Sequence, residues 1–387
     1  MSELSYLEKL LEGVEVEWVR LGNVARIKNG KDHKSLGEGN FPVYGSGGIM
    51  RYADTYAYDK PSVLIPRKGS LGNLFFVDAP FWTVDTIFYT IIDETQIRPK
   101  YFYYFLTTAG LGNMNQAGGV PSQTQSVLNE IKIPIPCPNN PEKSLAIQSE
   151  IVRILDKFTA LTAELTAELT ARKKQYNYYR DQLLSFEEGN RGSYLEKLLD
   201  GVEVEWIRLG NVARIKNGKD HKSLGEGNVP VYGSGGIMRY ADTYAYDKAS
   251  VLIPRKGSLG NLFFVDAPFW TVDTIFYTII DETQIRPKYF YYFLTTAGLG
   301  NMNQAGGVPS QTQSVLNEIK IPIPCPNNPE KSLAIQTEII RILDKFDTLT
   351  HSISEGLPRE IELRQKQYEY YRDLLFSFLK HETTVVN

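Results

Sequence analysis

The chain has 387 residues, of which 42% are hydrophobic, and it carries a formal net charge of -3 at pH 7. This length allows two or more domains with cores of their own, and the near-neutral charge excludes a uniformly basic nucleic-acid-binding protein. The sequence shows no signal-peptide pattern and no apolar run suited to a membrane span, which predicts a soluble, cytoplasmic protein.

Charge is unevenly distributed along the first part of the chain. Residues 1–19 contain five acidic residues and one lysine, whereas residues 20–73 contain nine basic residues against four acidic ones. An acidic segment followed by a basic one favours a protein with one face for an anionic ligand. A solvated face without a ligand is the alternative at this point.

The first 145 residues are typical of an irregular α+β globule. A short helix is expected near the start, and short β-like runs follow, separated by Gly, Pro, Asn and Asp. The predicted strands are residues 62–66, 73–77, 86–92 and 131–136. Residues 100–106 follow Pro99 and predict a small helix.

A long helix is predicted over residues 146–188. Its apolar positions are three or four residues apart, which gives a continuous stripe along one face. These positions are Ile147, Ile151, Leu155, Phe158, Leu161, Leu165 and Leu169. Residues 162–165 and 166–169 have the same sequence, Thr-Ala-Glu-Leu, so the helix is extended by whole four-residue steps.

The whole unit of globule and helix then repeats. Residues 5–11 recur as residues 193–199, and this offset of 188 holds as far as Leu161 and Leu349. From residue 21 to residue 148 the copies differ at two positions, Phe41 against Val229 and Pro61 against Ala249. Such a long period indicates two whole domains rather than a solenoid, arising from recent duplication or from fusion. The second globule is expected over residues 189–333, after a polar junction at 187–192.

In the second helical region, residues 334–387, the repeat offset changes from 188 to 192: residues 175–181 match residues 367–373, so the second copy is four residues longer there. Gly356 and Pro358 should break the helix, which is expected to resume at Arg359 and run to about Leu379. Two long apolar stripes in one chain favour an antiparallel coiled coil. The predicted fold class is therefore α+β, with two irregular α/β globules separated by two paired helices and related by internal pseudo-twofold symmetry.

No catalytic pattern accounts for these features. Residues 45–48 are glycine-rich but lack the third glycine of a dinucleotide motif, and residues 67–73 lack the spacing of a phosphate-binding loop. Each globule has one histidine, and neither Cys137 nor Cys325 has a CxxC or Cys/His neighbour. We therefore expect reduced thiols, no metal site and no cofactor held by this chain.

What remains is the chemistry of recognition, in residues 28–34, 67–70 and 113–123 of the first globule. Glycines let a backbone approach a polyanion, Lys and Arg neutralise phosphates, and Asn, Gln, Lys and Arg read base edges. One such segment alone is more often an ordinary surface loop, but three of them, duplicated, favour DNA contact. The candidate residues are Lys28, Lys31, His33, Lys34, Ser46, Arg67, Lys68, Ser70, Asn115, Gln116, Ser122 and Gln123, with Lys216, Lys219, His221, Lys222, Ser234, Arg255, Lys256, Ser258, Asn303, Gln304, Ser310 and Gln311 in the second copy.

The chain resembles the specificity subunits of type I restriction-modification enzymes. The resemblance lies in the order globule, helix, globule, helix and in residues 42–49, 66–72 and 131–136, the last followed by Ala146-Ile147-Gln148. It implies two target-recognition domains on double-stranded DNA, two bound methyltransferase subunits, and restriction or motor subunits that join the complex. S-adenosylmethionine would then be held by the methyltransferase partner. The chain departs from the family in the sameness of its two domains, which normally differ.

Aromatic clusters near the helix ends are the candidate partner-binding residues. They carry more ring surface than a narrow two-helix seam can bury, and exposed tyrosines are favoured at interfaces. The clusters are Tyr176, Tyr178 and Tyr179, and Tyr368, Tyr370 and Tyr371. Packing against the neighbouring globule is the alternative interpretation.

Two identical readers related by a twofold axis should read the same bases in inverted order, so we expect an interrupted palindrome as the target. Two other hypotheses stay open at this stage. One is a stand-alone DNA methyltransferase or nuclease, and the other is an adaptor with two identical ligand-binding domains that does not bind DNA.

Overall fold

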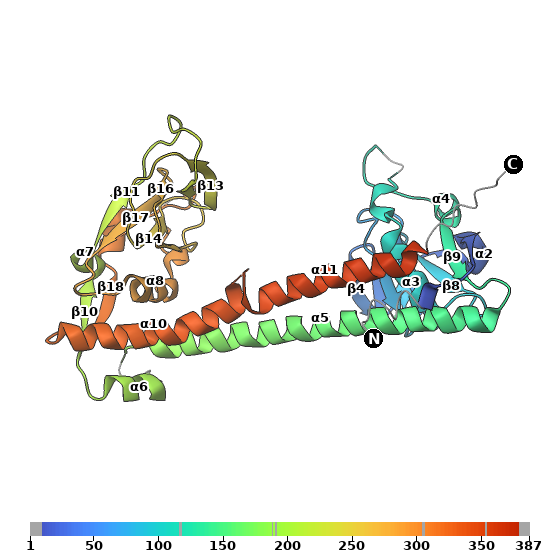
Figure 1. The fold of residues 1–387 in the computed structure, drawn as a ribbon, viewed down its shortest axis with the longest axis horizontal. Coiled ribbons are helices and arrows are strands. Elements are labelled where there is room, and N and C mark those ends of the chain that lie inside the picture. The colour runs from blue at the N-terminus through green and yellow to red at the C-terminus, as the bar shows by residue number, and fades with distance from the viewer. Residues whose placement is uncertain are drawn as a thin grey trace. The chain divides into compact units, whose positions relative to one another are not determined.

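The structure of the chain is a computed structural model that describes residues 10–115, 118–187, 189, 192–303, 306–352 and 354–378. It divides into two compact units (Figure 1). The first unit comprises residues 1–165 and 361–387, and the second comprises residues 166–360. Each unit contains one copy of the repeated globule, so the fold class of two α+β globules agrees with the prediction.

The first globule is built on three small sheets. Its strands are β1 (Val16–Arg20), β2 (Ala25–Asn29), β3 (Phe41–Gly45), β4 (Gly48–Ala53), β5 (Ser62–Pro66), β6 (Phe75–Val77), β7 (Trp82–Thr83), β8 (Ile87–Ile92) and β9 (Lys132–Pro136). The strand orders are β2-β8-β5-β6, β4-β3-β7 and β1-β9, and among the described strand pairs of this globule only β3–β7 is parallel. Every residue of β5 is buried, as its unbroken run of mostly apolar residues predicts.

Short helices close the core of this globule. They are α2 (Leu21–Val24), α3 (Pro99–Thr108), the 3-10 turn η1 (Leu111–Asn113) and α4 (Gln125–Asn129). Helix α3 begins at Pro99, where a proline costs no hydrogen bond, and it buries Tyr101 and Phe102 completely. The predicted strands and the small helix after Pro99 are therefore confirmed, with boundaries shifted by one or two residues.

The second globule has the same elements in the same order. They are α6 (Ser193–Leu199), β10 (Val204–Arg208), α7 (Leu209–Val212), β11 (Ala213–Asn217), β12 (Val229–Gly233), β13 (Gly236–Ala241), β14 (Ser250–Pro254), β15 (Phe263–Val265), β16 (Trp270–Thr271), β17 (Ile275–Ile280), α8 (Pro287–Thr296), η2 (Leu299–Asn301), α9 (Gln313–Asn317) and β18 (Lys320–Pro324). Helix α6 confirms the short opening helix. Residues 1–9, which correspond to most of it in the first copy, lie outside the described residues.

Each unit also contains a pair of long helices. Helix α5 (Pro141–Leu184) contributes to both units, while α10 (Pro329–His351) belongs to the second and most of α11 (Gly356–Ser377) to the first. In the first unit, the ring of Phe158 on α5 stacks on Tyr371 of α11 at 5.3 Å between centroids. In the second unit, Tyr176 meets His351 and Tyr179 stacks on Phe346. The two helices of that pair are therefore antiparallel.

Polar contacts fix each globule on its own helix. The Tyr104 hydroxyl donates to Asp156 of α5 at 2.6 Å, and Lys100 forms an ion pair with the same carboxylate at 2.8 Å. The buried side chain of Gln148 accepts from the Arg98 backbone N–H at 2.8 Å and donates to the Gln96 carbonyl at 3.1 Å. Because the equivalent contacts recur in the second unit, both globules are attached in the same way.

The break in the second helical region lies earlier than predicted. Helix α10 ends at His351 and α11 begins at Gly356, so Pro358 lies in the first turn of α11, where its missing N–H costs nothing. The prediction that the helix resumes at Arg359 is therefore wrong. Gly356 has φ +81, and a Cβ there would lie 2.4 Å from the Thr348 carbonyl oxygen, so the restart requires glycine. Helix α11 ends at Ser377, and Leu379 lies outside the described residues.

The four-residue length difference between the copies is absorbed at this break. Helices α10 and α11 have 23 and 22 residues, and together they nearly equal the 44 residues of α5. The segment from 352 to 355 lies between them and adds the extra length. The helical content of the two copies is therefore almost the same.

Candidate nucleic-acid interface

Two of the three polar segments singled out in the sequence lie side by side in the first globule. Lys68 and Ser122 form an isolated antiparallel bridge. On either side of it, the Gly69 N–H donates to the Pro121 carbonyl at 2.8 Å, and the Gln123 N–H donates to the Arg67 carbonyl at 3.0 Å. Residues 67–69 and 121–123 therefore form a short two-stranded patch, although 54 positions separate Lys68 from Ser122 in the sequence.

The turn between β3 and β4 joins this patch through Thr86. The backbone N–H groups of Arg67 and Lys68 donate to the Thr86 carbonyl at 2.8 and 3.2 Å. The Thr86 hydroxyl accepts from the Ser46 N–H at 3.3 Å, and the Asn73 amide donates to the Ser46 carbonyl at 3.2 Å. One threonine thus holds two loops together.

The first polar segment, residues 28–34, is attached to the same region. The Lys31 N–H donates to the Thr83 carbonyl at 2.8 Å, and the Gln125 amide donates to the Asn29 side chain at 3.0 Å. Gly30 is needed here, since a Cβ on it would lie 1.9 Å from the Val84 carbonyl oxygen. We call residues 28–34, 46–48, 67–70, 115 and 118–123 the loop surface.

The exposed candidates on the loop surface carry the groups that a polyanion requires. Lys31, Lys34, Lys68, Ser70 and Asn115 are exposed. Lys28, His33, Ser46, Arg67 and Ser122 are half-buried. The Arg67 guanidinium lies over the Phe88 ring, 5.9 Å from its centroid, so part of its role is packing.

One carboxylate lies within the basic loop. The Lys34 backbone N–H donates to Asp32 at 3.1 Å and holds the pKa of that carboxyl below its usual range. Asp32 is therefore ionised at neutral pH and shapes the loop between Lys31 and Lys34 through this turn.

Two of the predicted contact residues are not surface groups. Gln123 is buried, and its amide donates to the Pro66 carbonyl at 2.6 Å; Gln311 does the same with Pro254. These side chains brace the loop from inside, so the assignment of both to DNA contact is corrected. Gln116 and Gln304 lie outside the described residues.

The second globule repeats the loop surface. Lys256 and Ser310 form the matching bridge, and Thr274 accepts from the Ser234 N–H at 3.3 Å. The exposure classes of the second-copy candidates match those of the first: Lys219, Lys222, Lys256, Ser258 and Asn303 are exposed, and Lys216, His221, Ser234, Arg255 and Ser310 are half-buried.

Sequence reasoning missed the residues that join the loops, chiefly Thr86, Asn73 and Gln125. Thr86 had been included in a predicted strand, but β8 begins one residue later and leaves its hydroxyl beside the turn. A polar residue directly before an apolar strand was the available signal. Within the described part of the chain, no group of three His, Cys, Asp or Glu residues is placed to hold a metal, and no helix is long and apolar enough to cross a membrane.

The tyrosine clusters differ in their exposure. Tyr176 is buried against α10, where burial raises the pKa of its hydroxyl, so its assignment to partner binding is corrected in favour of packing. Tyr368 and Tyr371 are half-buried, and Tyr371 stacks on Phe158. Tyr178, Tyr179 and Tyr370 are exposed.

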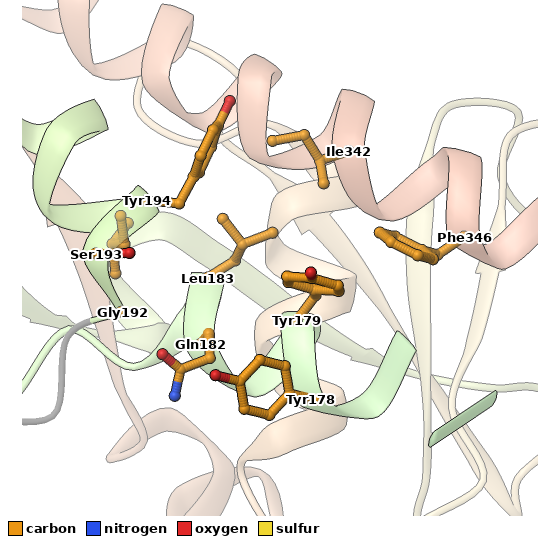
Figure 2. A pocket seen from close by; sticks show the side chains of 10 residues that line it. Tyr178, Tyr179, Gln182, Leu183, Gly192, Ser193, Tyr194, Ile342 and Phe346 are labelled. Carbon is orange, nitrogen blue, oxygen red and sulfur yellow. The ribbon is translucent and has the colours of Figure 1, made fainter. Parts of the chain in front are cut away.

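An apolar pocket of about 300 Å³ lies beside two of these tyrosines in the second unit. Figure 2 shows Tyr178, Tyr179 and Leu183 from α5, Tyr194 from α6, and Ile342 and Phe346 from α10 around it. The Tyr194 hydroxyl donates to Glu338 of α10 at 3.2 Å and so holds α6 against that helix. The pocket offers an aromatic, mostly apolar surface that suits an apolar side chain of another protein.

One basic, glycine-rich surface is therefore present in two copies, one in each globule. Comparison with known proteins identifies the class. The family model described as "Type I restriction modification DNA specificity domain" matches residues 13–172 and again residues 201–363. The chain belongs to the family of type I restriction-modification specificity subunits.

Relatives cover nearly the whole chain. It is 41% identical over 427 residues to the EcoR124I/EcoR124II specificity subunit of Escherichia coli, with 99% of each chain covered. It is 34% identical to a putative specificity subunit of Haemophilus influenzae, covering 97% of this chain and 98% of that one. The S subunit from M. genitalium has a similar fold, with a TM-score of 0.64, 21% identity, and 94% and 97% coverage. The chain is thus a DNA-recognition subunit rather than a catalytic one.

Proposed function

We propose that the two globules bind two equal half-sites of one DNA duplex through their loop surfaces. The observation that carries this proposal is the duplication of the loop surface on globules that differ at two positions between residues 21 and 148. We place this activity in the cytoplasm, in a complex with two methyltransferase subunits and with restriction or motor subunits. We assign residues 1–145 and 189–333 to recognition, and 146–188 and 334–387 to spacing and assembly.

Physical chemistry supports this use of the loop surface. Phosphate contacts fix the position of a protein on DNA, and Lys and backbone N–H groups supply them. Sequence is read by groups that reach base edges, for which Asn115 and the serines beside Lys68 are suited. Basic and neutral polar groups on one surface provide both kinds of contact.

Hydroxyl-radical footprinting of the complex with its methyltransferase subunits tests this proposal. We expect two protected stretches of equal length, separated by a less protected gap. A single protected stretch, or two of unequal length, would contradict two equivalent readers. Absence of any DNA binding would favour the adaptor hypothesis instead.

The length of α5 should set the gap between the half-sites, because this one helix contributes to both units. One further Thr-Ala-Glu-Leu unit after Leu169 would lengthen the helix by about 6 Å. At about 3.4 Å per base-pair step, the protected stretches should separate by one or two base pairs without changing their sequence.

A length-preserving variant is the control for this experiment. Replacing residues 166–169 by four alanines keeps the helix length and should leave the gap unchanged. An unchanged gap after the insertion would mean that α5 does not determine the spacing.

The exposed tyrosines are the proposed methyltransferase contacts. Replacing both Tyr178 and Tyr370 by serine should reduce co-purification with the methyltransferase subunits about tenfold, because aromatic anchors dominate such interfaces. The matched Tyr178→Phe and Tyr370→Phe variants keep the rings and should retain the complex. Equal co-purification of the serine and phenylalanine variants would show that these rings face solvent.

A further inference from the structure

Strand β4 is an edge strand with an unusual outer surface. In the sheet order β4-β3-β7 it has one neighbour, and its residues Ile49 and Met50 are 48% and 59% exposed. Tyr52 is exposed as well. Edge strands of soluble proteins are normally protected by charged side chains, so an apolar edge indicates a surface that is covered by a partner.

The charged residue of this strand is used internally. The Arg51 guanidinium donates to the carbonyls of Leu36 and Gly37 at 3.2 and 3.1 Å. It therefore braces the loop before β3, and the apolar side chains are what β4 presents outward. An edge strand that stays exposed to water would instead present its charged side chain outward and turn its apolar side chains inward.

A β-bulge determines where Met50 lies. Tyr44 pairs with Ile49 and Val43 with Arg51, so Met50 is the extra, unpaired residue. The Met50 sulfur lies close to the backbone of Gly45, because a Cβ added to Gly45 would be 2.6 Å from that sulfur. Bulges commonly redirect one side chain toward a binding site, and this one places Met50 beside the Ser46–Gly47 turn of the loop surface.

A second exposed apolar side chain, Val120, lies in the loop that pairs with residues 67–69. Val120 is 69% exposed, and its neighbour Pro121 accepts the Gly69 N–H at 2.8 Å. Residues 67–69 therefore bond to the loop that carries Val120 and, through Thr86, to the turn that precedes Ile49 and Met50. We call Ile49, Met50 and Val120, with Ile237, Met238 and Val308 in the second copy, the apolar ridge.

We infer that the apolar ridge contacts the base pairs of the bound DNA, while the lysines beside it hold the phosphates. This inference rests on the proposed function, because it takes DNA as the occupant. The ridge borders the lysines that would fix the duplex, and apolar side chains gain nothing from phosphates but pack against thymine methyl groups and base faces.

The dependence of affinity on salt separates these two kinds of contact. Each phosphate neutralised by a lysine adds to the salt dependence, whereas an apolar contact with a base does not. The variant Met50→Ser with Met238→Ser, in complex with the methyltransferase subunits, should bind a duplex carrying the mapped target about tenfold more weakly. Binding to an unrelated duplex and the salt slope should both stay as in the wild type.

Two further variants provide the controls. Trp18 in β1 and Trp206 in β10 are 38% and 37% exposed but lie outside the loop surface, so Trp18→Ser with Trp206→Ser should bind the target as the wild type does. Lys68→Ala with Lys256→Ala should instead reduce the salt slope by about two, one for each phosphate contact. Thermal melting of each variant checks that its fold is intact.

Three results would overturn the inference. Unchanged affinity of the methionine variant would mean that the ridge does not touch DNA. A loss of affinity with a shallower salt slope would assign the ridge to phosphate positioning. A loss of co-purification with the methyltransferase subunits would make it a protein interface. Failure of the wild-type complex to bind DNA would instead refute the proposed function itself.

Discussion

Methylation mapping of DNA from cells that carry this chain and its methyltransferase partner is expected to show an interrupted palindrome. Each modified site should have a short half-site, a gap of unread bases, and the reverse complement of the half-site. The physical reason is that two readers with the same loop surface must select the same bases. Type I targets with two unrelated half-sites require two different readers.

Between residues 21 and 148 the two copies differ at two positions, and both lie outside the loop surface. Phe41 begins β3 and packs edge-on against Tyr56 at 5.0 Å, where the second copy has Val229. Pro61 directly precedes β5, and Ala249 replaces it. The variant Phe41→Val with Pro61→Ala makes the two copies identical between residues 21 and 148. Cells that carry it with the methyltransferase partner should show methylation at the same sites. A methylome with two unrelated half-sites would contradict the assignment of equal readers.

Removal of four basic side chains should abolish most DNA binding. Replacing Arg67, Lys68, Arg255 and Lys256 by alanine is expected to weaken binding on the order of a hundredfold or more at low salt, because up to four phosphate contacts are lost. The slope of log affinity against log salt concentration should become shallower by about three to four. Titration of labelled duplex at several salt concentrations measures both quantities.

Arg67 and Arg255 need a separate check, since each guanidinium also packs over a phenylalanine ring. The variant Lys68→Ala with Lys256→Ala leaves those stacks intact and should show about half of the change in slope. If affinity and slope both match the wild type, the loop surface is not the DNA-binding face.

Local patterns predicted the elements better than the site. The buried strand β5 and helix α3 follow from an unbroken apolar run and from a proline before an aromatic segment. The polar loops were also recognisable by composition. Gln123 was misassigned because it belongs to a polar, glycine-bearing segment, while its own amide is buried and donates to the Pro66 carbonyl. That carbonyl is 57 residues away, and no local pattern reveals it.

Long-range contacts explain the other differences. Thr86 joins two loops because β8 starts after it and its hydroxyl meets the Ser46 N–H, a contact across 40 residues. Helix α11 begins at Gly356, where the nearby Thr348 carbonyl leaves no room for a Cβ, and not after Pro358. Met50 looks like an ordinary strand residue until the register of β3 and β4 shows the bulge.

The first unit is completed by residues that are synthesised long after its globule. Leu375, Phe376 and Phe378 lie in its core, and the Phe376 ring packs against Tyr101 at 5.2 Å and Phe105 at 5.7 Å. The second unit ends at residue 360. On a ribosome that adds about 5–20 residues per second, the first globule waits roughly 10–40 s after residue 165 for this part of its core. During translation we therefore expect the second unit to complete its core before the first. Until then the first globule exposes apolar surface to which chaperones can bind.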